Sequence, residues 1–173
     1  REVNVNKLIG LIAGTFLLTA VAAEDLKPRA RDIGIAPGIL APGALNDITD
    51  VQGVKVGHVT IQQDARVNPG VTVIIPADGN LYQEKVPAAI YVGNGFGKLA
   101  GLSQVRELGE IETPIALTNT LNVPEGVAAL MEWTLDQPGN ENVRSVNAVV
   151  GETNDGYLND IRARVLTKSH FIE

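Results

Sequence analysis

Short runs of aliphatic and β-branched residues recur along the chain after residue 50, and glycine or proline interrupts them. Alternating apolar and polar positions predict a strand over 51–61, and the unbroken apolar run at 70–76 predicts a buried strand. Similar runs predict strands over 87–97, 113–121 and 142–152. The segment 87–97 is expected to enter a glycine turn, so the pattern as a whole indicates aliphatic strands joined by tight turns.

Helical spacing appears in the segments that separate the later strands. In 99–109 a leucine or valine recurs at every third position and a glycine closes the run, which predicts a short amphipathic helix. Segment 123–139 has a proline in its first turn and Pro138-Gly139 at its end, which predicts the longest helix. Segment 161–173 also looks helical, but it stops without a cap. The inward face of the long helix is expected to carry Val127, Leu130, Met131 and Thr134.

The order of these elements predicts a mixed α/β or α+β fold. Residues 24–50 contain repeated Ala-Pro and Ala-Pro-Gly breaks, so we expect a loop there. No stretch within 29–173 has the composition of a linker, and a single domain is therefore expected.

The first residues have the layout of a targeting segment. Residues 8–23 form an uncharged apolar run after Lys7, and small residues at 20–23 offer a cleavage site. The run is shorter than the roughly 20 residues that a membrane-spanning helix needs. We therefore expect residues 1–23 to be a secretory signal peptide and the mature protein to be periplasmic or secreted, without a stable membrane anchor. The alternatives are an uncleaved N-terminal anchor and a core helix.

Charge and residue usage exclude several classes of function. The net charge of −6, without a basic stripe, argues against a nucleic-acid partner. The absence of cysteine excludes disulfides, thiolate catalysis and cysteine-based metal sites. With only two histidines and no HExxH motif, the sequence predicts neither a metal nor a cofactor.

Three polar stretches have simple structural interpretations. GNGFGKLAG (93–101) lies between a strand and a helix, but it matches neither phosphate-loop pattern, so its glycines are interpreted as allowing close backbone approach. His58 lies alone in a strand with no GxSxG motif to supply a serine, which favours a hydrogen-bonded structural role. LTNTLNVPEG (117–126) is interpreted as a helix cap made by Asn122 or a neighbour, and DITD (47–50) as a turn rather than a calcium loop.

GETNDGYLND (151–160) allows two interpretations. Asn154-Asp155-Gly156 is a strong turn former, and spacing alone favours a surface turn. Glu152, however, follows directly from a buried strand, where a carboxylate needs a partner. A cationic group of a ligand would be one such partner.

Several stretches together resemble the N-terminal part of the DmpA family, the L-aminopeptidase/D-esterase and β-peptidyl aminopeptidases of peptidase family S58. The resemblance runs from about residue 29 to the end of the sequence, in the same order throughout. The stretches are RARDIGI (29–35), NDITDVQGVKVGHVTI (46–61), GVTVIIP (70–76), GNGFGKLAG (93–101), ETPIALTNTL (112–121) and GETNDGYLND (151–160).

The resemblance implies an αββα sandwich and a precursor that cleaves itself into α and β chains. It implies a serine nucleophile at the new N-terminus of the β chain, activated by its own α-amine, and an oxyanion hole. The substrate would be a small peptide or amide with a free amine, held by Glu152 with Asn154 and Tyr157 as pocket neighbours. The partners would be the β chain of the same precursor and, in the complete protein, further copies in a homo-oligomer.

The family's serine and oxyanion segment are expected downstream of Glu173. We therefore interpret residues 24–173 as an incomplete N-terminal part of the α-chain domain, inactive alone and with apolar strand faces exposed. The alternatives are an ornithine-acetyltransferase-like acyltransferase, which shares the self-processing fold plan but uses a threonine nucleophile, and a non-catalytic secreted binding domain.

Overall fold

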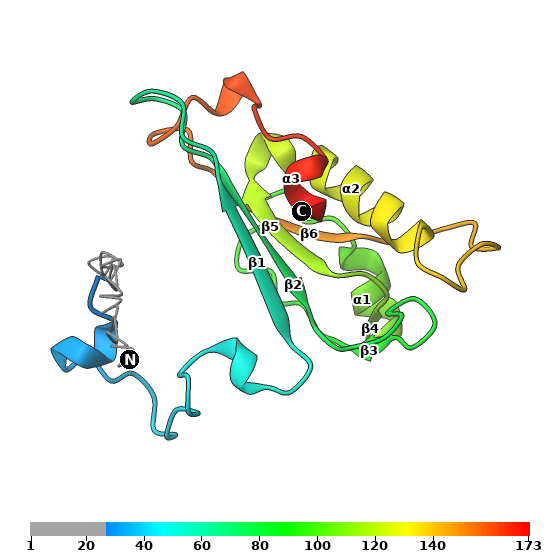
Figure 1. Ribbon diagram of the computed structural model, residues 1–173, viewed down its shortest axis with the longest axis horizontal. Coiled ribbons are helices and arrows are strands. Elements are labelled where there is room, and N and C mark those ends of the chain that lie inside the picture. The colour runs from blue at the N-terminus through cyan, green and yellow to red at the C-terminus, as the bar shows by residue number, and fades with distance from the viewer. Residues whose placement is uncertain (1–26) are drawn as a thin grey trace, which may run out of the picture. The chain divides into compact units, whose positions relative to one another are not determined.

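A four-stranded mixed sheet organises the protein (Figure 1). Its strands lie in the order β1-β2-β5-β6. Their bounds are β1 Lys55–Thr60, β2 Gly70–Ile75, β5 Ile115–Asn119 and β6 Val149–Thr153. The pairs β1–β2 and β2–β5 are antiparallel, whereas β5 and β6 are parallel, with helix α2 in the connection between them.

The computed structural model describes residues 27–173, so the predicted signal peptide, residues 1–23, lies outside the described residues. The chain divides into two units, one ending at Leu40 and the other comprising 41–173. The described part of the first unit contains a 3-10 helix, η1 (Ala30–Ile33), and the sheet belongs to the second. Within residues 27–173, no helix is long and apolar enough to cross a bilayer.

The prediction of a strand over 87–97 is wrong for most of its length. Only Val86–Pro87 forms a strand, β3, which pairs with β4 (Glu110–Ile111) in a separate two-stranded ribbon. The rest is an irregular loop in which Tyr91 is 92% exposed. An apolar run becomes a strand only where a partner strand supplies backbone hydrogen bonds, and the glycines that follow do not favour an extended chain.

The helices begin and end where local chemistry dictates. Helix α1 (Leu102–Leu108) ends at Gly109, as predicted. Helix α2 (Val123–Leu135) follows the 3-10 turn η3 (Thr120–Asn122). It ends four residues before the predicted end at Gly139, because Pro138 disfavours helical backbone at the residue before it. Of its predicted inward face, Leu130 and Thr134 are buried, but Met131 is 37% exposed.

The predicted helix over 161–173 is broken into two short pieces. A 3-10 turn, η4 (Ile161–Ala163), ends at Arg164, which has the left-handed φ of 46°, and α3 (Ser169–Ile172) follows. The predicted strand over 142–152 is also shorter than expected. Residues 142–148 approach the sheet without pairing, because only 149–153 lie beside β5.

The core has two parts, one on each face of the sheet. Val71, Ala116 and Val150 pack beneath α2 and α3, which lie side by side in Figure 1. On the opposite face, Val149 packs with Val105 of α1 and Ile111 of β4. The mixed α/β prediction is therefore confirmed: within residues 41–173, the four-stranded sheet has α2 and α3 against one face and α1 with the β3–β4 ribbon against the other.

The opposite face is covered only in part. Strand β1 lies at the edge of the sheet, and the register places Val56 and Leu117 on the face away from α2. They are 43% and 45% exposed, so apolar strand surface is open to solvent within residues 41–173, as expected.

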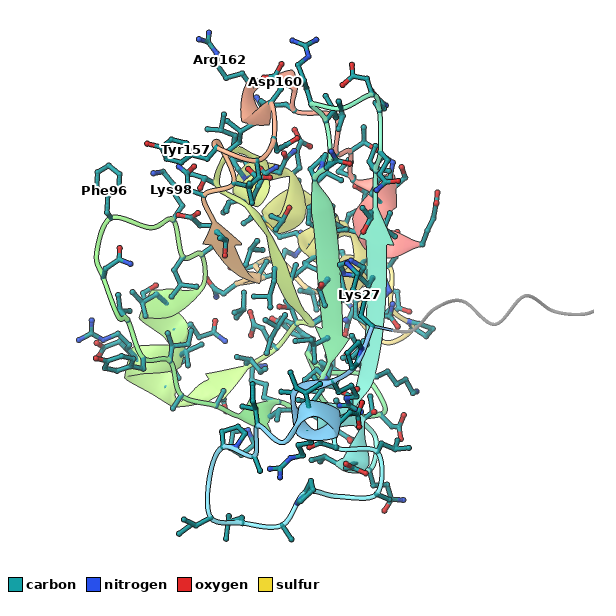
Figure 2. All side chains as sticks on the ribbon, turned by 90° about the vertical axis from the view of Figure 1, so that its left-hand side faces the viewer. Lys27, Phe96, Lys98, Tyr157, Asp160 and Arg162 are labelled. Atoms are coloured by element: carbon teal, nitrogen blue, oxygen red, sulfur yellow. The ribbon has the colours of Figure 1, made fainter. Side chains whose placement is uncertain are left out.

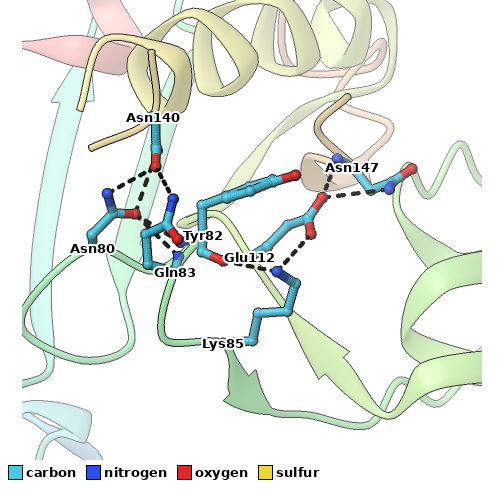
Figure 3. Close-up of polar contacts among 7 residues, drawn as sticks. All are labelled: Asn80, Tyr82, Gln83, Lys85, Glu112, Asn140 and Asn147. Carbon is cyan, nitrogen blue, oxygen red and sulfur yellow. Dashed lines mark hydrogen bonds and ion pairs between the residues drawn. The ribbon is translucent and has the colours of Figure 1, made fainter. Parts of the chain in front are cut away.

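Two polar clusters connect the segment 80–85 to the chain that leads into β6 (Figure 3). The carboxylate of Glu112 is buried; it pairs with Lys85 Nζ at 3.5 Å and accepts a 2.8 Å hydrogen bond from the backbone N–H of Asn147. The side-chain oxygen of Asn140 accepts hydrogen bonds from Asn80 and Gln83, both at 2.9 Å. These contacts fix the approach to β6 at its N-terminal end.

Replacing Leu130 by alanine should lower the free energy of unfolding by about 2–5 kcal/mol, because the side chain is 1% exposed within the core beneath α2. Leu135→Ala is the matched control. It removes the same atoms from the same helix, but Leu135 is 40% exposed, so the loss should stay below about 1 kcal/mol. Denaturant unfolding of both variants checks this, and equal losses would contradict the assignment of the inward face.

Candidate functional site

Strand β6 carries Glu152 to the end of the sheet, and the strand pairing fixes what lies beside it. In the parallel ladder, Thr118 is opposite Glu152 and Asn119 is opposite Thr153. The C-terminal ends of β5 and β6 therefore lie side by side, and the stretches 117–126 and 151–160 meet there. The sequence shows these two stretches as separate features, and the parallel pairing brings them together.

The stretch 93–101 reaches the C-terminal end of β6 from the side of the strand opposite to β5. Ala100 and Val150 exchange backbone hydrogen bonds, with N···O distances of 3.0 and 3.4 Å. The approach requires the next residue to be glycine: Gly101 has φ +80°, and a Cβ there would lie 2.7 Å from the carbonyl oxygen of Ala148. The loop 93–98 is thereby held next to Glu152.

The carboxylate of Glu152 is bound from both sides by neutral donors. The backbone N–H of Lys98 donates to Oε1 at 3.1 Å, and the hydroxyl of Thr120 donates to Oε2. A Cβ built on Gly97 would lie 3.2 Å from Oε1, so the loop passes very close to the carboxylate. None of the ion pairs formed within residues 27–173 includes Glu152. Its need for partners is thus met without a side-chain cation.

The start of α2 lies beside this carboxylate. Thr120 opens η3, which leads directly into α2, and the side chain of Asn119 accepts a 3.1 Å hydrogen bond from the N–H of Asn122. The cap is therefore made by Asn119, and Asn122 makes no side-chain cap.

The two predicted pocket neighbours take different positions. Asn154 uses its side-chain oxygen to accept a 3.0 Å hydrogen bond from the N–H of Gly156, which confirms the predicted turn. The ring of Tyr157 is fully exposed and extends away from the ribbon in Figure 2. A role for either side chain in a pocket stays a prediction.

The histidine in β1 has a structural environment. Its Nδ1 lies 2.7 Å from the hydroxyl of Thr72, and its Nε2 lies 3.1 Å from the hydroxyl of Thr60. Both ring nitrogens of His58 are occupied by threonine, which agrees with a hydrogen-bonded strand residue.

DITD forms a turn, as predicted, with η2 spanning Ile48–Asp50. Backbone N–H groups of Leu45 and Asp47 donate to the carboxylate of Asp50 and lower its pKa below the ordinary value. In residues 27–173 no three His, Cys, Asp or Glu side chains gather in a way that could hold a metal ion.

Comparison with known proteins identifies the family to which this fold belongs. Residues 46–173 match Peptidase family S58, and the chain belongs to that family. It is 39% identical over 169 residues to the beta-peptidyl aminopeptidase BapA of Sphingosinicella xenopeptidilytica, and 36% identical to the BapA of Sphingosinicella microcystinivorans. These alignments cover 92% and 95% of this chain but 42% of each relative.

Solved structures agree with this assignment. The PH0078 protein of Pyrococcus horikoshii superposes with a TM-score of 0.79 at 46% identity, and the Burkholderia sp. beta-aminopeptidase with 0.77 at 39%. The L-aminopeptidase D-Ala-esterase/amidase of Ochrobactrum anthropi, described as a variant of the Ntn hydrolase fold, gives 0.72 at 31%. Each comparison covers 84% of this chain and 42–44% of the other, so the chain spans less than half the length of these relatives.

The sequence predicts that Glu152 needs partners but does not predict which groups supply them. The Lys98 N–H is a backbone group with no sequence signature of its own, and the sequence around Thr120 indicates only a helix cap. The usable signal was the ends of two buried strands, at 113–121 and 142–152, each followed by polar residues. It becomes informative only if those strands are known to be parallel neighbours.

Gly97→Ala should displace the Glu152 carboxylate by a few tenths of an ångström and weaken its bond to the Lys98 N–H, because the new Cβ would lie 3.2 Å from Oε1. A loss of about 1 kcal/mol would speed hydrogen exchange at the Lys98 amide roughly 5-fold. Gly95→Ala is the matched control in the same loop, since a Cβ there meets nothing within 4 Å. Equal exchange in both variants would contradict the close contact.

Proposed function

We propose that the full-length protein is a self-processing serine aminopeptidase or amidase that removes N-terminal residues from small peptides, amides or esters. Membership of family S58 supports this, and so do the named relatives, which are aminopeptidases. The observation that carries the proposal is the position of Glu152. It is an oriented carboxylate at the end of a buried strand, with no side-chain cation paired to it within residues 27–173.

Glu152 is proposed to bind the substrate's free ammonium group. A carboxylate offers about four acceptor positions. The Lys98 N–H and the Thr120 hydroxyl occupy one on each oxygen. The remaining positions suit an ammonium, which has three donors, and a charge-assisted hydrogen bond of this kind contributes about 1.5–3 kcal/mol. A substrate lacking the amine would leave this contact unmade, which gives selectivity for a free N-terminus.

The bond-breaking groups are proposed to come from the part of the protein that corresponds to the remaining length of its relatives. A serine hydroxyl there attacks the substrate carbonyl while the serine's own α-amine takes the proton. Oriented donors stabilise the tetrahedral oxyanion. The substrate's leaving amine takes the proton back from the serine's α-ammonium and departs. Water then hydrolyses the ester that links the acyl group to the serine. Asn154 and Tyr157, whose turn follows Glu152, are proposed to border the substrate once that part is in place.

Location and assembly belong to the same proposal. The layout of residues 1–23 supports export to the periplasm or beyond. The β chain of the same precursor and further copies of the protein are the proposed partners. The names of the relatives favour hydrolysis over the acyl transfer of an ornithine-acetyltransferase-like protein.

Glu152→Gln in the full-length protein should raise KM for an aminoacyl p-nitroanilide by roughly 10- to 100-fold, because the side chain loses its charge and keeps its shape. KM for the matched desamino substrate should change little. Glu107→Gln, on the exposed surface of α1, is the control for loss of one negative charge. An unchanged KM for the amino substrate in the Glu152 variant would refute the proposed amine site.

A further inference from the structure

The two donors to Glu152 come from segments held against opposite edges of the same strand. Thr120 follows the end of β5, which pairs with one edge of β6, whereas Lys98 precedes Ala100, which bonds to the other edge. Each donor binds a different oxygen of the carboxylate. The pair therefore restrains the side chain by its two ends, and rotation of the carboxylate breaks at least one of the bonds.

Thr120 is the more specific of the two donors, because its hydroxyl belongs to a side chain that has little freedom. The residue is 7% exposed and opens η3, where the Asn119 side chain fixes the backbone by accepting from the Asn122 N–H. A threonine hydroxyl donating to a carboxylate makes a charge-assisted bond, about twice as strong as a neutral one. Any residue except proline can supply the backbone N–H at position 98, but the contact at position 120 needs a side chain that donates a hydrogen bond.

We propose that Thr120 is a positioning residue for the amine site, and that its hydroxyl selects the Glu152 conformation that faces the substrate's ammonium group. The inference rests on the proposed function, since it assigns Thr120 a part in binding through Glu152. Without the hydroxyl, Glu152 still accepts from Lys98 but samples other rotamers. The ligand then has to order the side chain on binding, and affinity for the amine falls while the reacting bond is left untouched.

The test is a double-mutant cycle in the full-length protein with Thr120→Val, which replaces the hydroxyl by a methyl group of similar size. Thr120→Val should raise KM for an aminoacyl p-nitroanilide about 10-fold with little change in kcat, while Thr120→Ser, which keeps the hydroxyl, should stay within about 3-fold of the parent. In the Glu152→Gln background, Thr120→Val should add less than about 2-fold, because the two residues act through one contact.

Thr118→Val is the matched control, because Thr118 is also buried and its hydroxyl bonds a backbone carbonyl, that of Gly70. Its effect on the amino substrate should match its effect on the desamino analogue. The proposal is overturned if Thr120→Val changes both substrates equally, or if its effect multiplies fully with that of Glu152→Gln.

A crystal structure of the Thr120→Val variant separates this inference from the proposed function. Displacement of the Glu152 side chain from its position beside Lys98 and Thr120 supports positioning, and an unchanged Glu152 conformation overturns it. If Glu152→Gln leaves KM unchanged, the amine site fails on that result alone, and the structure of the variant still decides whether Thr120 positions the carboxylate.

Discussion

The burial of β6 on both faces is the constraint on which the other features depend. Val149 packs against α1 and β4, and its neighbour Val150 packs beneath α2 and α3. Consecutive residues of a strand point to opposite faces, and a slip of one residue would exchange the two environments. Two covers of different shape therefore set the register of β6, and the register sets where Glu152 emerges.

Both edges of β6 are occupied as well as both faces. β5 runs along one edge, and the residues around Ala100 run along the other. The polar cluster around Glu112 holds the chain just before the strand (Figure 3), so β6 is restrained from its beginning to its end. A glutamate at the end of such a strand has few conformations available, and the groups that bind it come from the segments along those edges. The candidate site is therefore a product of strand packing together with the loop 93–98, which the bridge between Ala100 and Val150 holds beside β6.

The parts of the structure that follow local rules could be predicted from the sequence. The turn at Asn154-Asp155-Gly156 and the end of α1 at Gly109 each depend on residues within a few positions, and both are confirmed. Segment 87–97 was assigned wrongly because an apolar run says nothing about whether a partner strand is within reach. The partners of Glu152 cannot be predicted for a related reason: Thr120 depends on the parallel pairing of β5 and β6, and Lys98 depends on the antiparallel bridge between Ala100 and Val150. The resemblance to a known family predicts a role for Glu152, which stays a prediction, whereas the contacts that orient its carboxylate follow only from the three-dimensional structure.

The long connections within the site have a consequence for folding. Thr120 and Lys98 lie 32 and 54 residues from Glu152 along the chain. Contacts of such separation form late, after the entropy of closing the intervening loops has been overcome. The carboxylate is therefore not oriented in the unfolded chain or in an isolated peptide of residues 151–160. Protection of the Lys98 amide from hydrogen exchange during refolding would therefore report the docking of β6 between its neighbours.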